Sequence, residues 1–363
     1  MVRACLGLAA VAAFALPAPA SADTLGYCDP AATQFDPVDV PKQGSASVPV
    51  PGVQERTIDL NGVRTRLLEA GDPEAETAVV FLSPGGAADW ATLLPLVTSA
   101  NVRAIAFDLP GFGHAEPTWG ASQRLDAAAS YLEGALIQLG VREVHLVVHD
   151  IGGPPGMEWG ARHPKQLRSV TLIDTGLLLG YRHHQLAQIS RQPDVGEAFW
   201  LQMNRAEWNF GVQQGQTPQR PLPLDFANRL YDDFDRETRC ATIGVYRSTD
   251  EPEINAFAQR QASILAQQPN RPALVIWGAG DPYLPAEMAN RQREGFPSAR
   301  VEIFGDSGHW PFADNPDRTR ELVVPFILNA IAGDASVGAQ QPATAKRKHP
   351  HKRKKKRKRR RRR

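Results

Sequence analysis

This sequence has few cysteines, no internal repeat and no apolar run long enough to cross a membrane. An early apolar stretch, residues 4–16, falls short of the roughly 20 residues that a membrane-spanning helix needs. The composition also lacks the bias of fibrous proteins. With the membrane and fibrous classes excluded, a globular protein remains. A chain of 363 residues with 42% hydrophobic content can form the core of one large α/β domain with an insertion, or the cores of two smaller domains.

The histidines and cysteines carry no clear spacing signal. Ligand spacing is missing among His114, His149, His183 and His184, so we expect no metal and no other cofactor. Of the three cysteines, Cys28 and Cys240 form an even pair in a compartment that permits oxidation. A single pair does not show whether the two residues approach each other. A disulfide and two free thiols are both left open.

The first 22 residues resemble a secretory signal peptide. Arg3 precedes the apolar run, and Ala20-Ser21-Ala22 has the small-x-small pattern of a signal-peptidase site. A buried N-terminal helix is the alternative. We therefore expect a secreted or extracellular protein whose mature chain begins near Asp23 and contains no transmembrane segment.

Basic residues are concentrated at the other end of the chain. Residues 346–363 hold 15 of the 41 Lys and Arg and no acidic residue. A block of like charge cannot offset its chain entropy by burial, so we expect a disordered tail. Such a tail would bind anionic surfaces or polymers non-specifically and hold the protein at a cell surface. The alternative is a solvated tail without a partner.

Short apolar runs alternate with helix-sized segments through the middle of the chain. An Asn61-Gly62 turn predicts a hairpin. Six near-continuous apolar runs then follow, at 78–82, 103–109, 144–149, 169–174, 273–278 and 301–304. Such runs are typical of strands buried on both faces of a parallel sheet. The stretch between Asp174 and Arg271 has none, which predicts a mainly helical cap over the carboxyl ends of the strands.

The predicted fold class is therefore α/β, a mostly parallel central sheet flanked by helices with an inserted cap. The predicted segments are a signal peptide at 1–22, an N-terminal arm at 23–54, the core at 55–175 and 271–333, the cap at 176–270, and a disordered linker and basic tail at 334–363.

A lone carboxylate stands where one predicted strand ends. His149 ends the run 144–149, Asp150 follows, and residues 151–153, Ile-Gly-Gly, lead into Pro154 and Pro155. This is the pattern of a strand–turn–helix nucleophile elbow, in which small residues let the helix approach the strand. Proline suits a first helical turn. Asp150 is the candidate nucleophile, and a solvated turn residue or helix N-cap is the alternative.

With the segments 108–113, 278–285 and 305–316, this elbow resembles the α/β-hydrolase superfamily over about residues 56–326. The order nucleophile, acid, histidine is the order of that superfamily. The resemblance implies that His309 is the base and Asp281 the acid that orients it. Asp174, at the end of another predicted strand, is the alternative acid. The His-Asp elbow resembles the branch with an Asp nucleophile, the epoxide hydrolases and haloalkane dehalogenases.

An Asp nucleophile indicates attack on saturated carbon. A carboxylate with an ordinary pKa of about 3.9 is ionised at neutral pH without help from a base. The product is an alkyl-enzyme ester, which water activated by His309 would cleave. The oxyanion donors are expected to be the backbone N–H groups of Ile151 and Gly85. The loop that carries Gly85 begins Ser83-Pro84, where the family usually has His-Gly.

The leaving group separates the two leading activities. Dehalogenases hold the halide with a Trp directly after the nucleophile, where this chain has Ile151, although Val148 is more typical of dehalogenases. Epoxide hydrolases protonate the ring oxygen with cap tyrosines, and the candidates are Tyr181, Tyr231 and Tyr246. We favour an epoxide hydrolase-like enzyme acting on a small molecule. The alternatives are a dehalogenase-like hydrolase and a non-catalytic surface protein that acts through its basic tail.

Overall fold

The computed structural model describes residues 49–333, apart from 118–122, 215, 218 and 249. The predicted signal peptide, Cys28 and the basic tail lie outside the described residues, so the expectations about them stay predictions. Within the described part, no helix has the length and apolar character that crossing a membrane requires.

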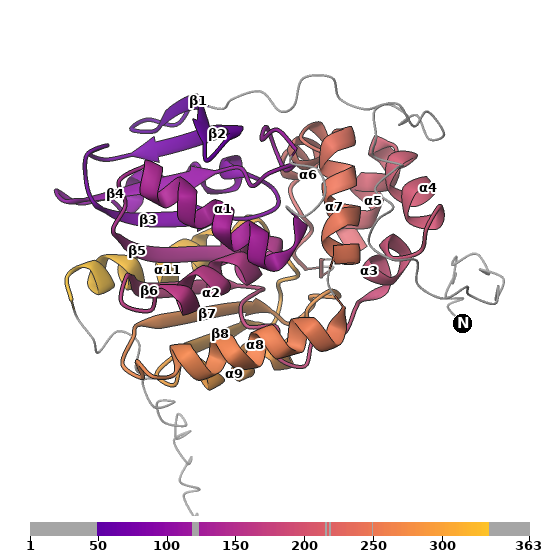
Figure 1. Ribbon diagram of the computed structural model, residues 1–363. Coiled ribbons are helices and arrows are strands. Elements are labelled where there is room, and N and C mark those ends of the chain that lie inside the picture. Colours follow the sequence, from indigo (N-terminus) through magenta and orange to yellow (C-terminus); the bar gives the residue numbers. More distant parts are fainter. Residues whose placement is uncertain (1–48, 118–122, 215, 218, 249, 334–363) are drawn as a thin grey trace, which may run out of the picture.

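An eight-stranded sheet forms the centre of the molecule, in the order β1-β2-β4-β3-β5-β6-β7-β8 (Figure 1). β2 is antiparallel to β1 and β4, and every other neighbouring pair is parallel. The strands are β1 (Gln54–Leu60), β2 (Val63–Ala70), β3 (Thr77–Leu82), β4 (Val102–Phe107), β5 (Glu143–His149), β6 (Leu167–Ile173), β7 (Ala273–Gly278) and β8 (Arg300–Phe304). The predicted mostly parallel sheet is confirmed.

The hairpin between β1 and β2 has the predicted turn. Asn61 and Gly62 have φ angles of 50° and 81°. Two successive positive φ values match the twist of a two-residue hairpin, and Asn followed by Gly tolerates them best. The turn therefore sets the register that pairs Leu60 with Val63.

Helices cover both faces of the sheet. In β3, Val80 and Leu82 join a core cluster with residues of α1, α2 and α8, whereas Val79 and Phe81 join a second cluster with α11. Figure 1 shows α1, α2 and α8 along one face of the sheet. These helices are α1 (Leu125–Gln138), α2 (Gly153–Arg162), α8 (Glu251–Leu265) and α11 (Pro316–Ile331). Burial on both faces explains why the strand sequences are continuously apolar.

Five further helices form the layer beyond the carboxyl ends of the strands (Figure 1). They are α3 (Gln185–Ser190), α4 (Val195–Leu201), α5 (Arg205–Gln214), α6 (Leu224–Asp232) and α7 (Arg236–Ser248). They have small apolar clusters of their own, one of which contains Trp200, Phe234 and Ile243. Cys240 is buried in α7 and is disulfide-bonded, and Cys28 lies outside the described residues.

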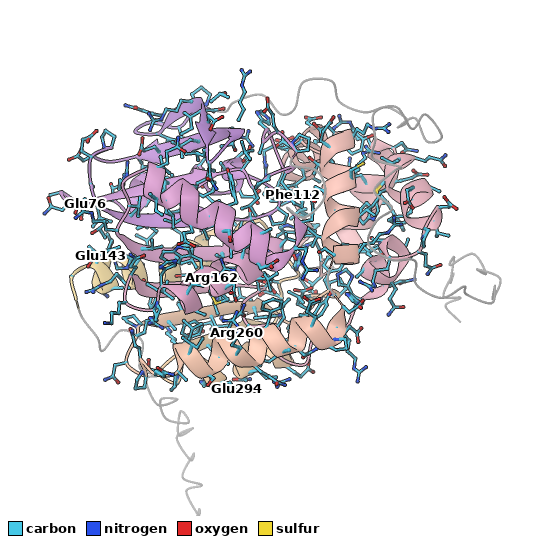
Figure 2. All side chains as sticks on the ribbon, viewed as in Figure 1. Glu76, Phe112, Glu143, Arg162, Arg260 and Glu294 are labelled. Carbon is cyan, nitrogen blue, oxygen red and sulfur yellow. The ribbon has the colours of Figure 1, made fainter. Side chains whose placement is uncertain are left out.

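The helix α8 belongs with the sheet rather than with these five helices. Its Arg260 and Gln261 donate hydrogen bonds to the buried carboxylate of Glu158 in α2, which also accepts one from Arg162. Figure 2 shows Arg162 and Arg260 on the side where α2 and α8 lie next to each other. The predicted cap span, residues 176–270, therefore includes one helix that packs on the core.

Candidate active site

The backbone at Asp150 is strained in the way that an elbow requires. β5 ends at His149, the short 3-10 turn η5 (Asp150–Gly152) follows, and α2 begins at Gly153. Asp150 has a φ of 43°, a left-handed conformation that costs a non-glycine residue of order 1–3 kcal/mol. The turn leaves the Asp150 side chain 27% exposed. The segment therefore presents a carboxylate at the end of a buried strand.

Two glycines allow this turn to pack closely. A Cβ on Gly152 would lie 2.5 Å from the carbonyl oxygen of Leu82, and one on Gly153 would lie 2.0 Å from Oγ1 of Thr175. Thr175 in turn donates a hydrogen bond of 2.7 Å to the carbonyl of Asp150. The ends of β3 and β6 thus hold the elbow, and larger side chains would push it away.

Asp150, His309 and Asp281 come together as predicted. Nδ1 of His309 lies 2.8 Å from Oδ2 of Asp281, and Nε2 lies 3.6 Å from Oδ2 of Asp150. The other Asp281 oxygen accepts the N–H groups of Tyr283 at 2.7 Å and Leu284 at 3.1 Å. Because Oδ2 of Asp281 accepts from Nδ1–H, the other ring nitrogen, Nε2, faces Asp150.

The charges of this cluster shift its pKa values in opposite directions. Burial alone would lower the pKa of His309, but the neighbouring carboxylates of Asp281 and Asp150 raise it well above its ordinary value. Burial would raise the pKa of Asp150, yet its contact with His309 holds that pKa below its usual range. At rest the site therefore contains an imidazolium next to an ionised Asp150.

Asp174 lies close to Asp281 and His309 but does not hydrogen-bond to the imidazole as Asp281 does. Its Oδ1 accepts the N–H of Gly278 at 2.9 Å. Burial, together with the charge of Asp281, raises the pKa of Asp174 well above its ordinary value. The environment of Asp174 thus favours its uncharged form, and the geometry favours Asp281 as the orienting acid.

The same residues have the composition of a cation site. Asp174, Asp281 and His309 offer ligand atoms that all lie within 4.8 Å of one another, and all three are buried. The 2.8 Å contact between His309 and Asp281 uses two of these atoms. The hydrogen-bonded pair accounts for the cluster without a metal ion.

The loop after β3 is held by the cap. Arg229 of α6 donates to the carbonyl of Gly85 at 3.0 Å and forms an ion pair with Asp89, whose side chain is 0% exposed. Ser83 donates to the same Asp89 carboxylate at 2.5 Å. The contact of the Gly85 carbonyl with Arg229 fixes the peptide between Gly85 and Gly86. Ile151, the other predicted donor, lies in η5 directly before α2, and the first N–H groups of a helix have no partner within the helix.

A cavity lies between the elbow and the cap. Its lining includes Asp150, Ile151 and Phe112, and Phe112 is labelled at the junction between core and cap in Figure 2. Tyr181 and Tyr246 also line it. Tyr231, the third predicted donor, is not among the lining residues; it is buried inside the cap, with Arg205 4.4 Å above its ring. The structure therefore brings two of the three predicted tyrosines to Asp150.

Three site residues were not assigned roles from the sequence. His149, directly before the nucleophile, contacts the His309 carbonyl through Nε2 at 2.8 Å, and burial lowers its pKa to about 3. Tyr283 packs edge-on against the His309 ring at 4.8 Å. His184 lines the cavity. Tyr283 could have been found from its place two residues after Asp281, whereas no sequence signal marks His184.

Comparison with known proteins supports the observed fold. A family model described as "alpha/beta hydrolase fold" matches residues 79–316. A 2-hydroxy-6-oxononadienedioate/2-hydroxy-6-oxononatrienedioate hydrolase of Cupriavidus pinatubonensis is 26% identical over 268 residues, covering 70% of this chain and 88% of the relative. An Escherichia coli hydrolase of the same name is 26% identical over 265 residues, covering 69% and 87%.

Solved structures show the same architecture. A haloalkane dehalogenase from Bradyrhizobium elkani superposes with a TM-score of 0.65 at 22% identity, covering 78% of this chain and 100% of that one. A haloalkane dehalogenase from Agrobacterium tumefaciens gives a TM-score of 0.64 at 18% identity, covering 77% and 98%. At such identities the likeness establishes the arrangement of the elements.

Proposed function

The chain belongs to the α/β-hydrolase fold family and is a hydrolase; on that premise we propose that Asp150 opens a small, uncharged substrate at saturated carbon, most favourably an epoxide. One observation carries the proposal. Asp150 stands at a strained elbow between the imidazole of His309, 3.6 Å away, and a cavity that Tyr181 and Tyr246 also line. This arrangement combines a nucleophile, a base and two hydroxyl donors.

The first step forms an ester. An Asp150 carboxylate oxygen attacks a ring carbon, the carbon–oxygen bond breaks, and the electron pair moves to the ring oxygen. A tyrosine hydroxyl supplies the proton that this oxygen takes up. Burial raises the pKa values of Tyr181 and Tyr246, so both hydroxyls are protonated at neutral pH. The product is a hydroxyalkyl ester of Asp150 and a tyrosinate.

The second step cleaves the ester. The imidazolium of His309 first releases its Nε2 proton to solvent. Neutral His309 then takes a proton from water, the hydroxide adds to the ester carbonyl, and the N–H groups of Ile151 and Gly85 bind the oxyanion. Collapse expels the alkoxide, which takes the proton from His309 and leaves as a diol. The proton on the regenerated Asp150 carboxyl returns to the tyrosinate, and His309 regains a proton from solvent. The sum is epoxide plus water to diol.

The cavity wall supports an uncharged substrate. No Lys or Arg is among the described residues that line it. Its two lining histidines cannot supply positive charge readily, because burial lowers the pKa of His183 and lowers that of His184 to about 4. The relatives named for dioate substrates act on dianions. A dianion here would lie next to ionised Asp150, with which the imidazolium of His309 is already paired, so we propose a different substrate class.

A haloalkane is the second candidate, because solved dehalogenases share the fold. A departing halide needs no proton but needs N–H donors. Ile151 follows Asp150 directly, and no Trp is among the described residues lining the cavity. The hydroxyls of Tyr181 and Tyr246 suit a basic alkoxide better than a halide.

A trapped ester tests the proposal. His309→Gln should be incubated separately with 1,2-epoxyhexane and 1-bromohexane and digested for mass spectrometry. The proposal requires an adduct on Asp150 with the epoxide, and none in the matched double variant Asp150→Asn/His309→Gln. An adduct with the bromide alone makes the protein a dehalogenase. Wild-type turnover of either compound with no adduct on Asp150 removes Asp150 as nucleophile.

A further inference from the structure

His184 and Tyr246 meet on the cap side of the cavity. Nε2 of His184 lies 3.3 Å from the hydroxyl oxygen of Tyr246, and the two rings pack edge to face with centroids 5.4 Å apart. Both residues line the cavity that contains Asp150. His184 directly precedes α3 and Tyr246 lies in α7, so the contact joins two cap helices at the site.

The backbone of α3 determines which nitrogen of His184 carries the proton. Nδ1 accepts the N–H of Ala187 at 3.3 Å and caps the helix. A ring nitrogen that accepts a hydrogen bond is unprotonated, so in the neutral ring the proton lies on Nε2. Burial lowers the pKa of His184 to about 4, and the ring is neutral at physiological pH. Nε2–H therefore donates to Tyr246.

This donation fixes the role of the tyrosine hydroxyl. Because the Tyr246 oxygen accepts from His184, its own O–H must point elsewhere. In the described part of the chain, His184 is the hydrogen-bond partner found for this hydroxyl. The open direction is the cavity, where Asp150 lies.

We propose that His184 is a positioning residue that directs the Tyr246 hydroxyl proton toward the substrate oxygen and stabilises the tyrosinate that forms. The inference rests on the proposed function and deepens it, since it makes Tyr246 the proton donor in ester formation. As the proton leaves Tyr246, negative charge grows on its oxygen, and the hydrogen bond from Nε2–H strengthens. His184 therefore acts mainly on the transition state, so its loss lowers kcat more than it changes KM.

Replacing His184 by Asn separates this role from helix capping. Asn is a good N-cap residue and can still accept the Ala187 N–H, but its shorter side chain loses the donor to Tyr246. We expect His184→Asn to slow single-turnover ester formation from 1,2-epoxyhexane by about 10–100-fold, with KM changed less than threefold. His163→Asn, at the far end of α2, is the matched control and should leave the rate unchanged.

A double variant tests whether the effect passes through Tyr246. In a Tyr246→Phe background, His184→Asn should cause no further loss, because the residue it positions is absent. If the two substitutions lowered the rate by factors that multiply, the inference would be overturned. A wild-type rate in His184→Asn, with Tyr246→Phe impaired, would overturn it as well.

Nitrogen NMR of histidine-labelled protein gives a readout independent of activity. The expected His184 signals are those of a neutral ring protonated at Nε2, and a ring protonated at Nδ1 would overturn the inference. The ester-trapping experiment with His309→Gln tests the proposed function separately. Failure to trap an ester would refute the proposed reaction. The tautomer of His184 and its contact with Tyr246 could still be tested by NMR in that case.

Discussion

Replacing Asp281 by Asn should reverse the tautomer of His309. One Asp281 oxygen accepts two backbone N–H groups, from Tyr283 at 2.7 Å and Leu284 at 3.1 Å. An Asn must place its carbonyl oxygen there, so its NH₂ group faces Nδ1 of His309 at the 2.8 Å position. Nδ1 then becomes the acceptor, and the ring proton moves to Nε2. An imidazole protonated at Nε2 cannot take a proton from water.

The expected loss of rate in ester hydrolysis follows from this geometry. A hydrogen bond to a charged group contributes about 1.5–3 kcal/mol, and about 1.4 kcal/mol corresponds to a tenfold change in rate. The reversed tautomer adds to the loss of this hydrogen bond. In serine hydrolases the same Asp-to-Asn change lowers kcat by about 10⁴-fold. We expect ester hydrolysis to slow by about 10²–10⁴-fold. Ester formation needs no base and should slow less than tenfold, so the Asp150 ester should accumulate and be seen by rapid-quench mass spectrometry.

Asp174→Asn is the matched control. Burial and the charge of Asp281 raise the pKa of Asp174 and favour its uncharged form, which Asn matches in both shape and charge. Asn also tolerates the left-handed backbone of this position, whose φ is 44°. We expect less than a tenfold change in either step. If Asp174→Asn slowed ester hydrolysis as much as Asp281→Asn, the reasoning would be refuted and Asp174 would be the orienting acid.

Three other changes follow from named contacts. Gly152→Ala places a Cβ 2.5 Å from the Leu82 carbonyl, so denaturant titration should show about 1–3 kcal/mol less stability; an unchanged midpoint would contradict that packing. Arg229→Met leaves the 0%-exposed Asp89 without its cation. The cost should be about 3–5 kcal/mol and should be largely recovered by adding Asp89→Asn, and failure to recover would refute the pairing. Asp281 still faces His309 in the ester and raises its pKa, so ester hydrolysis should accelerate as pH rises through the pKa that His309 has in the ester, because the neutral ring is the base. In the free enzyme, the stabilisation from protonated His309 is fully present below its unfolded pKa of about 6.5 and is lost as pH rises through its raised folded pKa. Ester hydrolysis that showed no rise with pH over the range in which the protein stays folded would exclude His309 as the base.

The sheet and the three residues Asp150, Asp281 and His309 could be predicted from the sequence because the signals for them are local. Each parallel strand is a continuous apolar run, and the Asn61-Gly62 pair encodes its own turn. Asp150, Asp281 and His309 each follow a strand, and strands of a parallel sheet end at the same edge. Knowing that three residues follow three strands is therefore nearly enough to bring them together.

The cap was less predictable because its packing depends on long-range contacts. Tyr231 and Tyr246 are similar in sequence terms, yet Tyr231 points into the cap interior and Tyr246 into the cavity. The N-cap contact of His184 with Ala187 is local, but its contact with Tyr246 spans 62 residues. The raised pKa of Asp174 likewise depends on its burial and on Asp281, which is distant in sequence.

The charges of the site can set the order of the two proposed steps. In the free enzyme Asp150 and Asp281 both face His309, and together they raise its pKa. The imidazolium then stabilises the nucleophile as an anion and is no base. Ester formation removes the charge of Asp150, so His309 loses the partner that lies 3.6 Å from Nε2 and keeps Asp281 at 2.8 Å from Nδ1. The pKa of His309 falls, its Nε2 proton passes to solvent, and the base appears only once there is an ester to hydrolyse.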